Sequence, residues 1–162
     1  MPNDIREQVM QDCERILALI VAGDPTGKPG NTFDIDIASI QRENPETQQY
    51  DSVPLCIMAA GTEAVEDENV GQIGKHLPIG IAIITRYDPD TPAHTADYLL
   101  NQLQAQVESA FLGDRDTNTL VQDYKLLGSI PYEPEEGFPM VGRIVMVDAH
   151  YWHSNIDPDY KS

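Results

Sequence analysis

The residues whose types could do chemistry are the histidines and the carboxylates near them. The chain has four histidines, at positions 76, 94, 150 and 153. His150 and His153, with Asp148 and Asp157 nearby, offer the imidazole and carboxylate groups that bind zinc. Residues three apart in a strand point to opposite faces, however. We therefore expect satisfied or exposed histidines there, and no metal site.

Clusters of acids give no clearer signal of chemistry. Glu66, Asp67 and Glu68 could offer oxygen ligands to calcium, but they lack the alternate-position spacing of an EF-hand loop. No glycine pattern of the nucleotide-binding type and no nucleophile elbow is present. Carboxylates are so numerous that the sequence singles out no catalytic pair. We expect no enzyme, no catalytic residue and no cofactor.

The elements that must position these groups begin with a helix. Asp4 and Glu7 form a plausible capping box, and an apolar stripe at helical spacing runs from residue 5 to residue 20. Apolar residues alternate with aspartates over residues 33–37, which predicts a strand. Residues 41–52 are polar and predict a loop. Residues 53–59 are apolar and predict a second strand.

An acidic, glycine-containing segment separates this part from the longer elements. Residues 61–75 are predicted as an exposed loop, and residues 77–84 as a strand. Pro78 lacks an N–H, so that end of the strand is expected at a sheet edge or a bulge. A second helix, capped near Thr95 and closed by Gly113, has one apolar stripe, with Gln106 assigned to the polar face.

The C-terminal part predicts a long antiparallel hairpin. Its arms are residues 120–130 and 140–152, and its tip is residues 131–139. The order helix, strands, helix, hairpin predicts an α+β domain: a mainly antiparallel sheet on which two amphipathic helices pack. We expect a single domain over residues 1–162, with an ordered core of about 4–152 and a tail of 153–162.

Composition and charge exclude several classes of protein. The chain has 162 residues, with 27 acids and 10 bases, and a net charge of −17. So negative a surface repels phosphates, which disfavours binding to DNA, RNA or anionic lipid. No apolar run has the length of a membrane span, and no secretion signal is expected at the N-terminus. Cys13 and Cys56 are expected to be buried free thiols.

Several strings along residues 5–152 resemble the tail terminator family of long-tailed bacteriophages, also called minor tail or tail completion proteins. The similar segments are residues 6–20 (first helix), 53–63 (a strand followed by acids), 77–84 (a strand), 99–111 with Gly113 and Asp114 (second helix), and 142–151 (closing strand). Residues 41–52 depart from the family's pattern.

The resemblance implies a role in assembly. Family members form a hexameric ring that stacks on the last ring of the tail tube, stops tube growth and offers a face to the head connector. DNA passes through the centre without specific binding. The chain would then be a virion protein of the phage tail or neck, assembled in the host cytoplasm, whose partners are itself, the tube protein and the connector. No membrane is involved.

Candidate contact residues follow from this implied ring. Acidic copies repel one another, so we expect subunit contacts among charge-poor residues of the hairpin. The candidates are Tyr132, Phe138, Arg143, Tyr151 and Trp152. Tyr151 and Trp152 could instead be a core pair that closes the sheet, and Arg143 should pair with an acid within the protomer or across the ring.

The acids are interpreted in two ways. Glu63, Glu66, Asp67 and Glu68 either are solvated or face the channel of the ring. Three other functions stay open: another neck or head-completion adaptor, an acidic DNA mimic that inhibits a DNA-binding enzyme, and a small enzyme. The DNA mimic is disfavoured because the acids are spread through several segments and do not follow one helix face.

Overall fold

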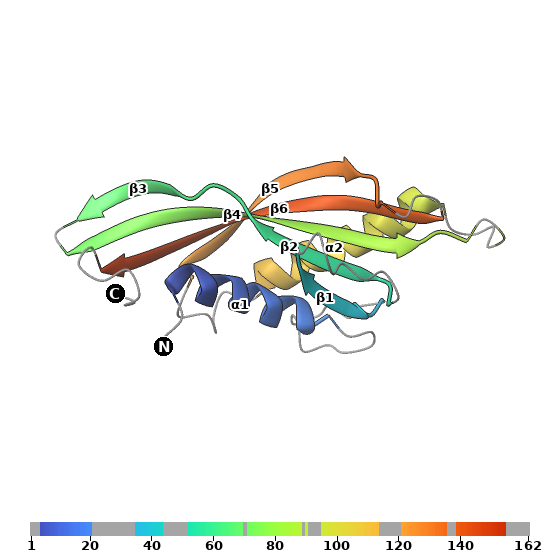
Figure 1. Ribbon diagram of the computed structural model, residues 1–162, viewed down its shortest axis with the longest axis horizontal. Helices are drawn as coiled ribbons and strands as arrows, with labels where there is room; N and C mark the ends of the chain where they lie inside the picture. The colour runs from blue at the N-terminus through green and yellow to red at the C-terminus, as the bar shows by residue number, and fades with distance from the viewer. Residues whose placement is uncertain are drawn as a thin grey trace.

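Two helices pack on one face of a six-stranded sheet in this computed structural model (Figure 1). The structure describes residues 4–20, 35–43, 52–69, 71–88, 90, 95–113, 121–135 and 139–154. The strand order is β1-β2-β4-β6-β5, and β3 also pairs with β4. All strand pairs are antiparallel except β1 with β2. The predicted α+β class is confirmed.

Helix α1 (Ile5–Ala18) forms where the apolar stripe predicts it. Asp4 is the N-cap, and its carboxylate accepts a hydrogen bond from the backbone N–H of Arg6 at 2.6 Å. The predicted stripe residues are all buried. The capping box is wrong in one part, because the Glu7 carboxylate binds Arg42, whose guanidinium also binds Glu14. These ion pairs fasten α1 to β1.

Helix α2 (Ala96–Gly113) is capped by Thr95, whose Oγ1 accepts a hydrogen bond from the N–H of Tyr98 at 3.1 Å. Its predicted apolar stripe is buried from Leu100 to Phe111, whereas Ala96 and Leu99 in the first turn are only partly buried. Gln106, assigned to the polar face, is buried instead. Its side-chain amide bonds both the N–H and the C=O of Ile35, each at 2.9 Å. Gln106 is thus a polar residue at a buried helix position, and its amide supplies the hydrogen bonds that the backbone of another segment needs.

Strands β4 (Gln72–Arg86) and β6 (Met140–Ser154) are the long central pair of the molecule (Figure 1). They pair without a break from Gln72↔Ser154 to Arg86↔Met140. Strand β5 (Asp123–Tyr132) pairs with β6 and completes the predicted hairpin. Strand β6 continues two residues past the predicted core limit at residue 152.

Strands β2 (Leu55–Ala60) and β3 (Ala64–Asn69) lie along the same side of β4, one after the other. The predicted loop over residues 61–75 is therefore wrong: β3 and the start of β4 form a hairpin. Acids are accommodated because β3 is an edge strand. Pro78 is in a central strand, and its C=O accepts from the Gly61 N–H at 2.7 Å, where β2 has ended and β3 has not begun. The backbone N–H that proline lacks is therefore missing at the gap between β2 and β3, where no strand pairs with β4 on that side.

Strand β1 (Ser39–Arg42) lies parallel to β2 at the edge of the sheet. The strand predicted over residues 33–37 is wrong where it can be compared, since residues 35–38 are not a strand; residues 33–34 lie outside the described chain. Ile35 and Ile37 nevertheless pack against the core. The predicted loop over residues 41–52 overlaps the end of β1, and its residues 44–51 are not described.

The apolar core has two parts, one on each face of the sheet. The large cluster lies on the inner face, between the sheet and both helices, and includes the odd-numbered residues 77–83 of β4 and 145–151 of β6. A smaller cluster lies on the outer face, which neither α1 nor α2 covers (Figure 1). Its members are Leu55, Ile57, Ala82, Ile84 and Met140, with Val53, Tyr132 and Ile144 packed against them.

Candidate functional site

The outer face of the sheet changes character along β4 and β6. The half next to β2 holds the small apolar cluster, whereas the half next to β3 holds polar and aromatic side chains. At the β3 end the sheet extends beyond both helices (Figure 1). Even-numbered residues of both long strands point to this outer face, so His76, Asp148, His150 and Trp152 share it.

His76 of β4 and His150 of β6 are directly opposite each other in the antiparallel pair. Their rings stack, with centroids 4.4 Å apart and an angle of 3° between the ring planes. The side chain of His76 is 17% exposed. His150 also contacts the ring of Trp152, with the centroids 5.8 Å apart. The two histidines are therefore held by sheet register on one side and by an aromatic ring on the other.

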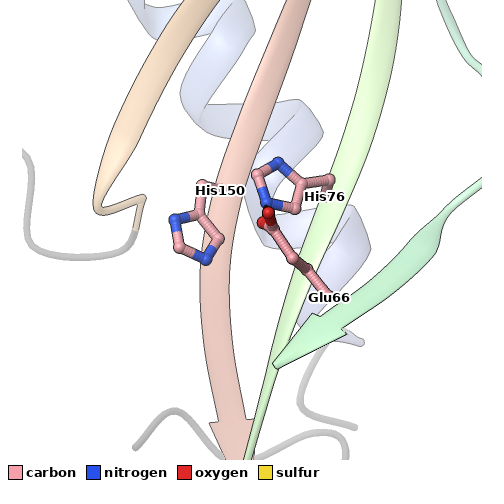
Figure 2. A group of neighbouring side chains, drawn as sticks. All are labelled: Glu66, His76 and His150. Atoms are coloured by element: carbon pink, nitrogen blue, oxygen red, sulfur yellow. Dashed lines mark ion pairs between the residues drawn. The ribbon is translucent and has the colours of Figure 1, made fainter. Parts of the chain in front are cut away.

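Two carboxylates flank the His76 ring. Asp148 Oδ2 lies 2.5 Å from Nδ1 of His76, and Glu66 Oε2 contacts Nε2. Glu66 is on β3, in a bulge where the pairing steps from Val65↔Lys75 to Asp67↔Gly74. A bulge redirects the side chain of its extra residue. Here the Glu66 carboxylate reaches the His76 ring, and His150 lies beside the pair (Figure 2).

Trp152 covers the end of this site. A Cβ on Gly74 would lie 3.0 Å from the Trp152 ring, so glycine lets the indole lie flat across β4. The indole N–H donates to Gln122 Oε1 at 2.7 Å. Trp152 is the single tryptophan of the chain. Its fluorescence can therefore report on changes at His150.

The arrangement offers two imidazoles and one carboxylate to a cation. Glu66, His76 and His150 each present a ligand atom, and these atoms lie within 4.8 Å of one another. Sequence reasoning considered His150 together with Asp148, and Glu66 among the acids, but it did not combine His150 with His76 and Glu66. His150 and His153 are on opposite faces as predicted, and His153 is buried. Asp148 belongs to the site, and Asp157 lies outside the described residues.

The four acids predicted as one channel-facing loop do not act as a unit. Glu63 is only 17% exposed, forms an ion pair with Lys75 at 2.9 Å, and accepts a hydrogen bond from the Tyr151 hydroxyl. Burial and this bond to Glu63 raise the pKa of Tyr151. Glu66 binds His76, and Glu68 is exposed on β3. The side chain of Asp67 lies outside the described set.

The predicted contact residues are spread over both faces of the sheet. Tyr151 is fully buried on the inner face, so its ring offers no surface to another subunit. Arg143 is also on the inner face, where its guanidinium binds Asp97 of α2 at 2.9 Å. Its predicted pairing with an acid is thus confirmed within the protomer. Tyr132 and Trp152 are on the outer face, and Phe138 is not described.

Neither helix in the described part of the chain combines the length and apolar character of a membrane crossing. The sequence matches no family model and no curated protein.

Proposed function

We propose that this chain is a structural protein of the tail-terminator type. Copies of it assemble, with six as the expected number, into a ring that caps the tail tube of a bacteriophage and stops its polymerisation. The ring joins the tail to the head connector, and DNA passes through its centre. Its place is the tail or neck of the virion, after assembly in the host cytoplasm.

The observation that carries this proposal is the outer face of the sheet, which neither of the two described helices covers (Figure 1). Its apolar half is continuous with Ile130, which is 50% exposed on the edge strand β5. Leu127, at the bulge of the same strand, is 54% exposed. Exposed apolar residues next to an apolar sheet face are typical of contacts between subunits. A second copy of this chain is the partner that a ring requires.

The segments that carry the resemblance also support the proposal. They coincide with α1, β2, the centre of β4, α2 and β6, which are the elements that build the two-layer fold. Edge pairing through β5 is less favoured as the contact, because this strand carries Lys125, a bulge and Pro131. We therefore assign the contact to side chains of the outer face around Ile130, Tyr132 and Ile144.

The experiment compares the assembly of variants by native mass spectrometry and by electron microscopy with purified tail tubes. We expect wild type to form rings, alone or on tube ends, and Ile130→Lys to lose them. Val65→Lys is the matched control, because Val65, on β3, is exposed to a similar extent, 54% against 50% for Ile130. Each lysine makes an acidic chain less negative, so added repulsion cannot explain a loss of assembly.

Two results would contradict the proposal. One is a wild-type protein that stays monomeric at high micromolar concentration and binds no tube. The other is assembly that Ile130→Lys leaves intact, which would place the contact elsewhere. Co-purification with a different neck ring would instead favour the adaptor function.

A further inference from the structure

We propose that Glu66, His76 and His150 bind a divalent transition-metal ion of the zinc type. Each ligand comes from a different strand: Glu66 from β3, His76 from β4 and His150 from β6 (Figure 2). The proposal concerns the protomer and does not depend on ring formation.

The bonding of His76 is the first argument. Its Nδ1 is held by the Asp148 carboxylate at 2.5 Å, as the outer nitrogen of a metal-binding histidine usually is. That contact directs Nε2 toward Glu66. A neutral imidazole with its proton on Nδ1 presents only a lone pair at Nε2. A lone pair and a carboxylate that face each other repel unless a proton or a metal ion lies between them, and we assign a metal ion to this position.

The second argument is the state of His150. Its Nε2 is buried and has no hydrogen-bond partner among the described residues. Buried nitrogens in proteins are normally satisfied. Its stacking on His76 keeps a ligand atom of His150 within 4.8 Å of those of His76 and Glu66. Because an imidazole binds a metal in the plane of its ring, His150 has to turn out of the parallel stack to share an ion with them.

The ligand set indicates the class of ion. Two imidazoles and one carboxylate suit zinc and its neighbours, whereas calcium and magnesium prefer oxygen ligands alone. Ligand atoms around zinc, at bonds of about 2.0–2.1 Å, lie about 3–4 Å apart. The ligand atoms lie within 4.8 Å of one another, so binding requires the Glu66 carboxylate to move away from Nε2 of His76 and the two stacked rings to tilt toward the ion. Glu66 is 57% exposed, which leaves an entry path and a position for water.

An ion at this place would fasten the edge strand β3 to the two central strands. Among the described strands, β3 pairs with β4 alone, and it lies where the sheet extends past the two described helices (Figure 1). The metal would add a second link from β3, through Glu66, to β6. We therefore expect binding to protect the β3 hairpin from local opening.

The test titrates ZnCl₂ into untagged, chelator-treated full-length protein at 0.15 M NaCl, followed by calorimetry and by Trp152 fluorescence. We expect one ion per chain with a micromolar or tighter Kd. Glu66→Gln and His150→Gln should weaken binding by at least tenfold. Glu68→Gln is the matched control, since it removes an exposed acid from the same strand, and its Kd should equal that of wild type. Co²⁺ should give the visible absorption of a nitrogen-ligated ion.

Because the chain is highly negative, the test must distinguish zinc binding at this site from nonspecific binding of cations to surface acids. Ca²⁺ at the same concentrations should neither compete with zinc nor change the fluorescence. Equal affinity for Ca²⁺, equal loss of affinity in Glu68→Gln and Glu66→Gln, or no zinc binding up to 1 mM would each overturn the proposal. Because Glu66 is exposed, its variant keeps the test valid if a histidine variant does not fold.

Discussion

At the scale of single residues, the two thiols have a clear pH behaviour. Cys13 and Cys56 are fully buried and form no disulfide, and burial raises the pKa of each to about 12. In the unfolded chain a thiol ionises near pH 8.5. Between about pH 9 and 12 the unfolded state has therefore lost protons that the native state keeps, so stability falls as pH rises. Below pH 8 this effect is absent.

We accordingly predict that urea unfolding at pH 9 and pH 10 shows a decrease of about 1 kcal/mol in unfolding free energy for each thiol. Native protein at pH 8 should react with iodoacetamide only as fast as it unfolds. The double variant Cys13→Ala, Cys56→Ala should be less stable at pH 7 but lose this dependence on pH. Rapid alkylation of folded wild type would contradict the prediction.

The candidate metal site could be predicted only in part from single residues. The spacing of His150 and His153 places them on opposite faces, as the structure does. That His76 stands opposite His150 depends on the register of two strands far apart in sequence, and no local pattern encodes it. The bulge that directs Glu66 could not be predicted either, because the sequence of these residues is typical of an acidic loop.

At the scale of elements, the long amphipathic segments could be predicted and the short edge segments could not. Both helices and the two long strands have apolar periodicity over many residues, which one buried face imposes. Strand β3 has mostly exposed side chains, so its sequence carries no alternating pattern. Residues 35–38 alternate like a strand, but the backbone of Ile35 is held by Gln106 of α2, a tertiary contact that local sequence does not specify.

This contact gives the prediction at the element scale. Gln106→Leu keeps the volume of the side chain but leaves the N–H and C=O of Ile35 without their partner. A buried polar group without a partner costs about 1–3 kcal/mol, which corresponds to a fall in Tm of roughly 2–4 °C per kcal/mol in a chain of this size. Calorimetry should show this loss, and hydrogen exchange should increase at residues 35–38.

Gln102→Leu is the control for that variant. Gln102 is on the same helix, and its amide donates to the Tyr98 hydroxyl at the surface. Surface changes typically alter stability by less than about 0.5 kcal/mol. Equal losses of stability in the two variants would show that the hydrogen bonds between Gln106 and Ile35 do not contribute to the stability of the fold.

At the scale of the whole molecule, the fold class follows from the types and order of the elements. Two amphipathic helices must cover one face of the sheet, and the C-terminal hairpin supplies two of the strands of the sheet. What the sequence does not reveal is the division of the outer face into an apolar half and a histidine half. This division arises only when β2, β3, β4, β5 and β6 are placed in register.

The proposed ring gives a prediction at this scale, because each copy brings a net charge of −17. Repulsion between copies is screened by salt over a Debye length of about 10 Å at 0.1 M and about 3 Å at 1 M. Contacts around Ile130 are apolar and are not weakened by screening. We therefore expect the oligomeric fraction, measured by sedimentation velocity at fixed protein concentration, to rise between 0.05 and 0.5 M NaCl. Ile130→Lys should stay monomeric throughout. An oligomer that dissociates as salt increases would mean that ion pairs hold the copies together, and the outer apolar face would then not be the contact.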